Sequence, residues 1–236
     1  MARLTRHQMK QDELSARLAA GMDFYLAHKK KISLVVAASV GVLAVGLGLY
    51  FYIRGQQSNA SSAFIRALNT YHAPVLAAAP NIPNLKSFTT NDAKNQQALE
   101  EFNTVAQEYS SYAAGRLARY YAAICQRELG NYAEAETEFQ SLSRIGDAKL
   151  ASLAKLGLAS VYEFTDRNAE AENIYKELEE NPTETVPKVT ALVARADLYK
   201  LTNVAEALTL YQQVQKEYPG TPAADYAGQM LTELPQ

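Results

Sequence analysis

Apolar positions in the second half of the chain recur at helical spacing and at one long period. A small, an aromatic and an aliphatic residue stand at Ala135, Phe139 and Leu142, and the same types return after 36 residues and again after another 36. The later sets are Ala171, Tyr175 and Leu178, then Ala207, Tyr211 and Val214. Positions i, i+4 and i+7 share one side of a helix, so each set marks a buried helical face. Recurrence at a fixed period predicts a stack of similar helix pairs.

The helices that alternate with these sets also carry a repeated pattern. Small residues at Ala123, Ala159 and Ala196 are each followed three positions later by a polar or aromatic side chain, namely Gln126, Tyr162 and Tyr199. A weaker set, Ala98, Phe102 and Val105, lies 37 residues before the first strong set. Turn residues separate the predicted helices, at Gly130-Asn131, Gly146-Asp147, Thr165-Asp166, Asn181-Pro182, Thr202-Asn203 and Pro219-Gly220. No stretch alternates with period two, so the predicted fold class is all-α.

Upstream of the repeats, residues 32–53 form an uninterrupted apolar run. The run has 22 residues without a charge, and a helix of that length spans about 33 Å, enough for a hydrocarbon core of about 30 Å. It therefore predicts a transmembrane helix. A cleaved signal peptide is the competing interpretation, but its apolar core usually has about 7 to 15 residues, and 31 residues precede this run.

Charge is distributed unevenly on the two sides of the run. Residues 1–31 carry seven Lys or Arg against three acids, whereas residues 54–236 carry 16 bases and 22 acids, a net of −6. Basic segments stay on the cytoplasmic side of a membrane, so the N-terminus is predicted to be cytoplasmic and the C-terminal domain to lie outside. An acidic domain lacks the basic patch that phosphate contacts need, and we expect no nucleic-acid partner.

The basic segment 1–31 also has a helical pattern. Leu14, Leu18, Met22 and Tyr25 fall on one face, which predicts an amphipathic helix. This helix either binds lipid headgroups or a protein partner, or it is an ordinary membrane flank that sets topology.

After the predicted span the chain changes character twice. Residues 54–94 are predicted to leave the bilayer at a polar stretch, to form a first extramembrane helix at 60–71 and to continue as a long loop rich in Pro and Asn. Residues 95–236 are predicted to form the repeat domain.

The repeated helix pair resembles the tetratricopeptide repeat, which has Leu-Gly-x-x-Tyr in its first helix and Ala, an aromatic residue and Pro in its second helix and exit. Leu158-Ala159-x-x-Tyr162 and the set Ala207, Tyr211 and Pro219 come closest to this pattern. The chain departs from it in its 36-residue period, in lacking Trp, and in having Gly146-Asp147 where the first strong repeat would end in Pro. The resemblance covers residues 95–220 and implies an α-solenoid of about three and a half repeats with a capping helix, which serves as a protein-binding scaffold.

The complete layout resembles the bacterial ancillary subunits of the Sec translocon. These also have a short basic cytoplasmic segment, one span and an extracytoplasmic repeat stack. The resemblance implies a single-pass protein of the inner membrane with a periplasmic repeat domain. It also implies protein partners, either within a membrane complex or among periplasmic chaperones and newly secreted proteins.

No residue pattern predicts a reaction centre. His7, His28 and His72 lie in three different segments, so metal-ligand spacing is lacking. Cys125 has apolar neighbours and no flanking Lys or His to lower its pKa, which favours a buried, inert thiol. The Glu-rich stretches fall on solvent faces of amphipathic helices beside Lys and Arg, without the burial or close like charge that a catalytic carboxylate needs. We therefore predict a protein that is not an enzyme, with no catalytic residue, no metal site and no cofactor.

Two surfaces are candidates for partner contact. The first helices of a tetratricopeptide stack line its groove, and the residues predicted to point into it are Tyr120, Arg127, Leu156, Glu163, Asp197 and Lys200. An alternative interpretation places the two apolar members in the core and leaves the charges solvated. Within the span, a stripe of small residues allows another helix to approach closely, at Ala37, Gly41, Ala44 and Gly48.

These surfaces favour different functions. A groove suits a non-catalytic, membrane-anchored periplasmic scaffold or adaptor in protein secretion or envelope assembly. A helix-packing stripe suits the alternative, a structural accessory subunit fixed in a large membrane complex.

Overall fold

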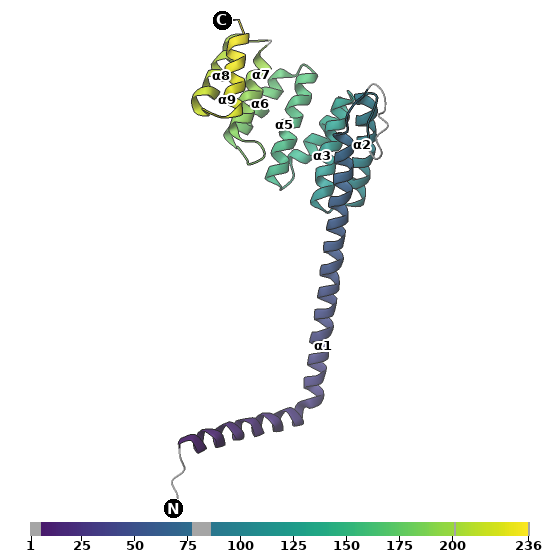
Figure 1. Cartoon of the computed structure of the whole chain (residues 1–236), viewed down its shortest axis with the longest axis vertical. Helices are drawn as coiled ribbons and strands as arrows, with labels where there is room; N and C mark the ends of the chain where they lie inside the picture. Colours follow the sequence, from purple (N-terminus) through teal and green to yellow (C-terminus); the bar gives the residue numbers. More distant parts are fainter. Residues whose placement is uncertain (1–5, 77–85, 201, 236) are drawn as a thin grey trace, which may run out of the picture. The chain divides into compact units, whose positions relative to one another are not determined.

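The computed structural model describes residues 6–76, 86–200 and 202–235, without the side chains of residues 6–16, 23, 24 and 32. Every regular element in these ranges is a helix, which confirms the all-α fold class (Figure 1). In order the helices are α1 (Arg6–Tyr71), α2 (Asn91–Glu108), α3 (Ala113–Glu128), α4 (Tyr132–Ser143), α5 (Ala148–Phe164), α6 (Asn168–Glu180), α7 (Lys188–Tyr199), α8 (Val204–Glu217) and α9 (Pro222–Glu233). The chain divides into two compact units, residues 1–56 and 57–236.

The first unit consists of the N-terminal part of α1 and carries the predicted span. The stretch from Ser33 is long and apolar enough to cross a membrane, by length and composition. Its apolar side chains are exposed, for example 72 % of Leu34 and 73 % of Val42. Of the predicted amphipathic face, Leu18, Met22 and Tyr25 are exposed, and Leu14 lies outside the described side chains.

The structure differs from the sequence prediction where the span ends. Residues 55–59 and 60–71 are predicted as a polar exit and a separate helix, but α1 continues through both to Tyr71. Inside a helix the backbone groups bond to one another whatever the side chains are, and a single glycine such as Gly55 costs a helix only about 1 kcal/mol. Hydrophilic composition alone therefore does not interrupt the helix.

The Pro-rich loop after α1 is shorter than predicted, because α2 begins at Asn91. Thr90 caps it, with Oγ1 accepting a hydrogen bond from the N–H of Ala93 at 3.1 Å. The described ends of the loop pair with each other: Leu76 N–H donates to the Phe88 carbonyl at 2.8 Å, and Phe88 N–H donates to the Pro74 carbonyl at 3.0 Å. The remaining predicted loop residues, 77–85, lie outside the described residues.

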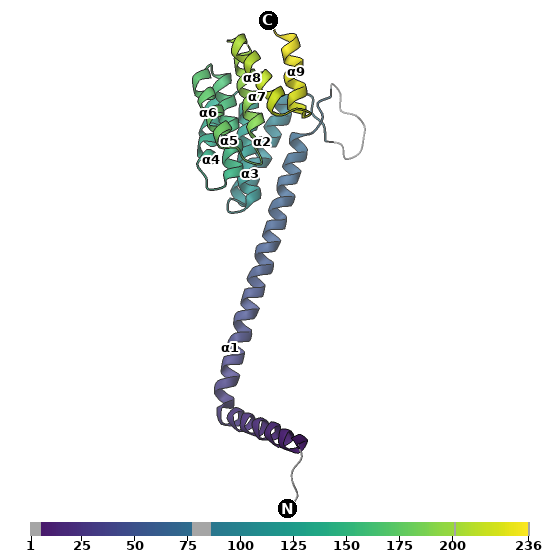
Figure 2. The ribbon, with the colours of Figure 1, turned by 90° about the vertical axis from the view of Figure 1, so that its left-hand side faces the viewer.

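The second unit is a stack of helices in which each helix packs against the next along the chain (Figure 2). The six predicted turns all fall between helices. The weak set in α2 also has a first helix, since Ala63 and Ala67 at the end of α1 share a core cluster with Ala98 and Phe102. The sequence predicts only half a repeat at α2, whereas the structure pairs α2 with the end of α1.

One break was missed, between α2 and α3 at residues 109–112, where no Gly or Pro occurs. The chain turns there because Gly115 lets the backbone close on itself. A Cβ atom on Gly115 would lie 2.0 Å from the carbonyl oxygen of Tyr109, a distance at which the backbone must shift. The signal was therefore a glycine three residues after the turn.

The core follows the predicted 36-residue pattern. The small, aromatic and aliphatic members of all four sets are buried. Small residues let paired helices approach, and an aromatic ring then fills the space beside them. At Gly157 in α5 the approach leaves no room for a side chain, since a Cβ atom would come within 2.6 Å of the Phe139 ring.

Ala171→Glu tests this packing, because Ala171 is fully buried. We expect the free energy of unfolding to fall by about 3–5 kcal/mol, the usual effect of an unpaired buried charge. Ala169→Glu is the matched control on an exposed position of α6, with an expected change within about 0.5 kcal/mol. Urea unfolding of the full chain in detergent, followed by circular dichroism, measures both variants. Equal effects would place the Ala171 face in solvent.

Candidate protein-binding surface

Three of the predicted groove residues lie on successive first helices, at positions that are only partly equivalent. Arg127 and Glu163 stand four residues after Ala123 and Ala159, whereas Asp197 stands one residue after Ala196. Arg127, Glu163 and Asp197 lie near the C-terminal ends of α3, α5 and α7. Their charges are close enough to act on one another. Burial raises the pKa of Glu163, Asp197 raises it further, and the hydroxyl of Tyr175 and the charge of Arg127 oppose this shift. We call these three residues the charged row.

Hydrogen bonds from the repeated aromatic position hold the acids of the charged row. The hydroxyl of Tyr175 on α6 donates to the Glu163 carboxylate. The hydroxyl of Tyr211 on α8 donates to Asp197 Oδ1 at 2.6 Å, and that of Tyr226 on α9 donates to the same oxygen at 2.7 Å. Each buried ring thus fills the core and also fixes a carboxylate on the neighbouring helix.

The first strong repeat differs at both of these positions together. Its aromatic residue is Phe139, which has no hydroxyl to donate, and its member of the charged row is Arg127. A half-buried acid at this position would lack the donor that stabilises it in the later repeats. Arg127 instead donates from Nη1 to Ser160 Oγ on α5 at 3.0 Å and pairs through Nη2 with Glu128 at 2.5 Å.

Arg127 also lies beside an exposed aromatic pair. Its guanidinium carbon is 5.9 Å from the centroid of the Phe164 ring. Phe164 stacks on Tyr132 with centroids 5.7 Å apart and is 60 % exposed. An exposed ring of this size next to a fixed cation is a typical contact element for a partner.

The other three predicted groove residues are tied more closely to the fold. Lys200 is 2.9 Å from Asp197 Oδ1 and donates to the Tyr226 hydroxyl at 3.3 Å. Tyr120 packs edge-on against Phe139 with centroids 5.8 Å apart, and its burial raises its pKa to about 12. Leu156 is half-buried against the core cluster of α6 and α7. The structure thus brings the four charged residues together and places Tyr120 and Leu156 at the edge of the core.

The predicted small-residue stripe lies in the first unit. Ala37, Gly41, Ala44 and Gly48 are all exposed. No atom lies within 4 Å of where a Cβ on Gly41 or Gly48 would stand. The face is therefore open to another helix.

Sequence reasoning missed a set of polar links between repeats. Arg167 binds the Glu136 carboxylate with two nitrogens, at 3.0 and 2.5 Å, and stacks over the Tyr162 ring at 4.2 Å. The corresponding Glu172 binds Lys176 and Tyr199, and the bonds from these two side chains lower its pKa. The signal was present, since Glu136 and Glu172 follow the 36-residue period, but their partners are evident only once the helices are paired.

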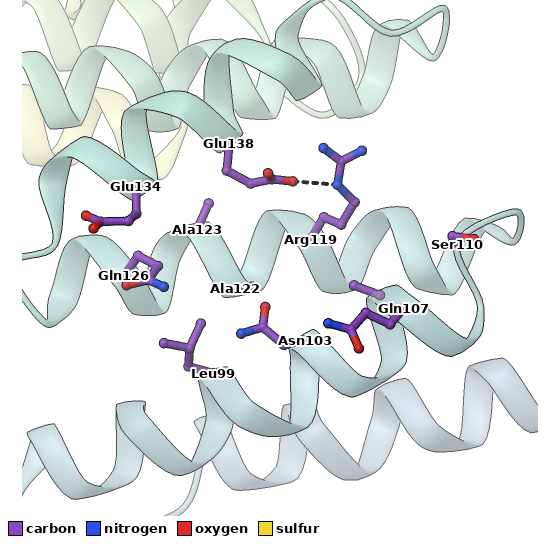
Figure 3. Close-up of a pocket in the computed structure, with 11 residues that line it drawn as sticks. Leu99, Asn103, Gln107, Ser110, Arg119, Ala122, Ala123, Gln126, Glu134 and Glu138 are labelled. Carbon is purple, nitrogen blue, oxygen red and sulfur yellow. Dashed lines mark hydrogen bonds and ion pairs between the residues drawn. The ribbon is translucent and has the colours of Figure 1, made fainter.

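A hollow on the first strong repeat was also missed. It has a volume of about 530 Å³ and lies between α2, α3 and α4 (Figure 3). Its lining includes Leu99, Asn103, Ala122, Gln126 and Glu134. None of the six predicted groove residues lines it.

Metal-ligand clusters and reactive thiols are not found in the described part of the chain. No group of three or more His, Cys, Asp or Glu there could hold a metal ion. Cys125 is fully buried, and burial raises the pKa of its thiol to about 12, so little thiolate exists at neutral pH.

The helix pairs, their buried small and aromatic positions and their capping helix define an α-helical repeat protein. A family model described as the tetratricopeptide repeat matches residues 117–144 and 190–221, which fall on α3 and α4 and on α7 and α8. The chain therefore contains tetratricopeptide repeats, a class that mediates protein–protein interactions and is generally non-catalytic. Neither the curated proteins nor the solved structures gave a match.

Glu163→Gln tests the electrostatics of the charged row. The pKa of Glu163 is raised above its ordinary 4.5, so above that pH the folded state holds this proton more tightly than the unfolded state. This group therefore makes stability fall as the pH rises from about 4 towards 7. The glutamine keeps an acceptor for Tyr175 and cannot ionise. We expect thermal unfolding to show the variant gaining stability relative to the wild type over this range. Glu170→Gln, on an exposed position, should show no such gain, and a flat difference for Glu163→Gln would contradict the assignment.

Proposed function

We propose that the chain is a non-catalytic, membrane-anchored scaffold that binds protein partners through the charged row and the adjacent exposed ring of Phe164. The row carries this proposal. Its side chains lie on three successive repeats and are held by hydrogen bonds with Ser160, Tyr175 and Tyr211. Charged side chains that are already held by hydrogen bonds lose little conformational entropy when a partner binds, which favours recognition. We further propose that the partners belong to protein secretion or envelope assembly, in line with the resemblance to ancillary translocon subunits.

The membrane anchor is the second part of the proposal. Residues 33–53 expose apolar side chains, and such a surface needs lipid or protein to cover it. The excess of bases in residues 1–31 supports a cytoplasmic N-terminus. The repeat domain would then be periplasmic in the bacterial inner membrane.

An alternative is a permanent accessory subunit of a large membrane complex. The open stripe at Gly41 and Gly48 favours it, because a partner helix could pack there at short distance. In that case the partner would be stoichiometric and would stay bound through detergent extraction.

Thiol labelling tests the topology. Ser58 and Ala20 are exposed, and the native Cys125 is buried with a raised pKa, so it should not react. Ser58→Cys is expected to react with a membrane-impermeant maleimide added to spheroplasts. Ala20→Cys should react only after the membrane is permeabilised. The reverse labelling would overturn the periplasmic placement.

Charge removal tests the row. Glu163→Gln combined with Asp197→Asn keeps the acceptors for Tyr175 and Tyr211 and removes two charges. We expect the amount of partner crosslinked to the full chain in cells to fall about tenfold, with the helical circular dichroism spectrum retained. Glu170→Gln combined with Glu206→Gln removes two exposed charges from α6 and α8 and is the matched control. Unchanged crosslinking in the test variant would reject the row as the binding surface and favour the accessory subunit.

A further inference from the structure

Successive repeats meet at three junctions, between α2 and α3, between α4 and α5, and between α6 and α7. At the second of these junctions a tyrosine, an acid and a cation join the repeats. Tyr162 packs against the core clusters on both of its sides. Arg167, the N-cap of α6, covers the ring and binds Glu136 with two nitrogens. The tyrosine ring thus fills the space between repeats, and a cation ties it to an acid.

The third junction, between α6 and α7, repeats part of this arrangement. Tyr199 bonds to Glu172, and Lys176 supplies the cation at 2.5 Å from the Glu172 carboxylate. The tyrosine is again three positions after the small residue of the first helix. At both junctions, side chains of the protein itself therefore fill the space between the repeats.

The first junction, between α2 and α3, lacks these side chains. The positions of the acid, the tyrosine and the N-cap cation are taken by Leu99, Gln126 and Asn131. Gln126 Oε1 accepts a hydrogen bond from Asn131 Nδ2 at 2.7 Å instead of reaching α2. Ala122 stands where the next repeat has Leu158. Neither Gln126 nor Ala122 therefore fills the space between α2 and α3 that Tyr162 and Leu158 fill in the next repeat. These smaller side chains account for the hollow of about 530 Å³.

The lining of the hollow is apolar at its base and acidic at its edge. Leu99, Ala106, Ala122 and Ala123 contribute apolar surface. Among the charged residues that line it, Arg119 is paired with Glu138 at 2.5 Å, as Figure 3 shows, and Glu134 is an additional exposed acid. An aromatic ring can lie on the apolar base, and a cation beside it can reach Glu134.

We propose that this hollow is a second protein-binding site, which receives a tyrosine side chain next to a lysine or arginine from a partner segment. The partner would supply the two groups that the first junction lacks and that Tyr162 and Arg167 supply at the second. None of the residues of the charged row lines this site. The proposal therefore goes beyond the function proposed above and does not depend on it.

A single tryptophan gives a direct measurement, because the chain has none. Gln107→Trp, at the edge of the hollow in the full chain in nanodiscs, serves as the fluorescent reporter. The probe is a blocked heptapeptide with a central tyrosine between two lysines. The comparison peptides carry alanine in place of the tyrosine, or glutamates in place of the lysines. We expect the tyrosine peptide to bind at least about tenfold more tightly than the alanine peptide, since an aromatic ring is buried. We also expect the glutamate flanks to weaken binding.

Filling the hollow provides the second arm. Gln126→Tyr with Ala122→Leu gives the first junction the side chains of the second and should abolish binding of the tyrosine peptide. If this pair changes the thermal unfolding, Asn103→Lys tests the site from an exposed position at its edge and should weaken binding by repelling the lysines. Glu163→Gln with Asp197→Asn should leave binding unchanged, which separates this site from the charged row. Absence of binding, equal affinities for the tyrosine and alanine peptides, or binding that survives both hollow variants would overturn the proposal.

Discussion

The close approach of paired helices at the repeated alanine is the constraint on which the rest of the structure depends. Ala98, Ala135, Ala171 and Ala207 have no exposed surface, and a larger side chain at any of them would separate the helices. Separation would remove the space that the aromatic ring four positions later occupies. The ring positions in turn determine where the tyrosine hydroxyls meet the acids of the charged row, so the polar surface depends on an apolar contact.

Polar interactions between repeats complete what apolar packing begins. Hydrophobic contact is not directional, whereas the bonds at Glu136, Glu163 and Asp197 each require one register between neighbouring helices. The variation between repeats is also coupled. Where the ring lacks a hydroxyl, as in Phe139, the facing acid is replaced by Arg127.

The sequence predicts the fold well because a 36-residue period carries the same information three times. Helix starts and breaks were less predictable. The break at residues 109–112 has no Gly or Pro, and α1 passes through a polar stretch that looked like its end. Four of the six predicted groove residues carry charges that the structure brings together. The hollow could not be found from single positions, because it arises from small residues on three helices. Comparison of Ala122 and Gln126 with Leu158 and Tyr162 could have indicated it.

The core is divided into four clusters along the stack, and among the described residues Tyr162 and Ile174 pack against two of them. A chain organised in this way has no central nucleus whose loss unfolds the whole. Stability is the sum of the individual pairs and their junctions, so opening can begin at one pair while others stay folded. The first junction lacks the tyrosine and the acid that join the later repeats. A molecule bound across that junction would therefore slow the exchange of amide hydrogens in α2 and in the adjacent end of α1 with solvent.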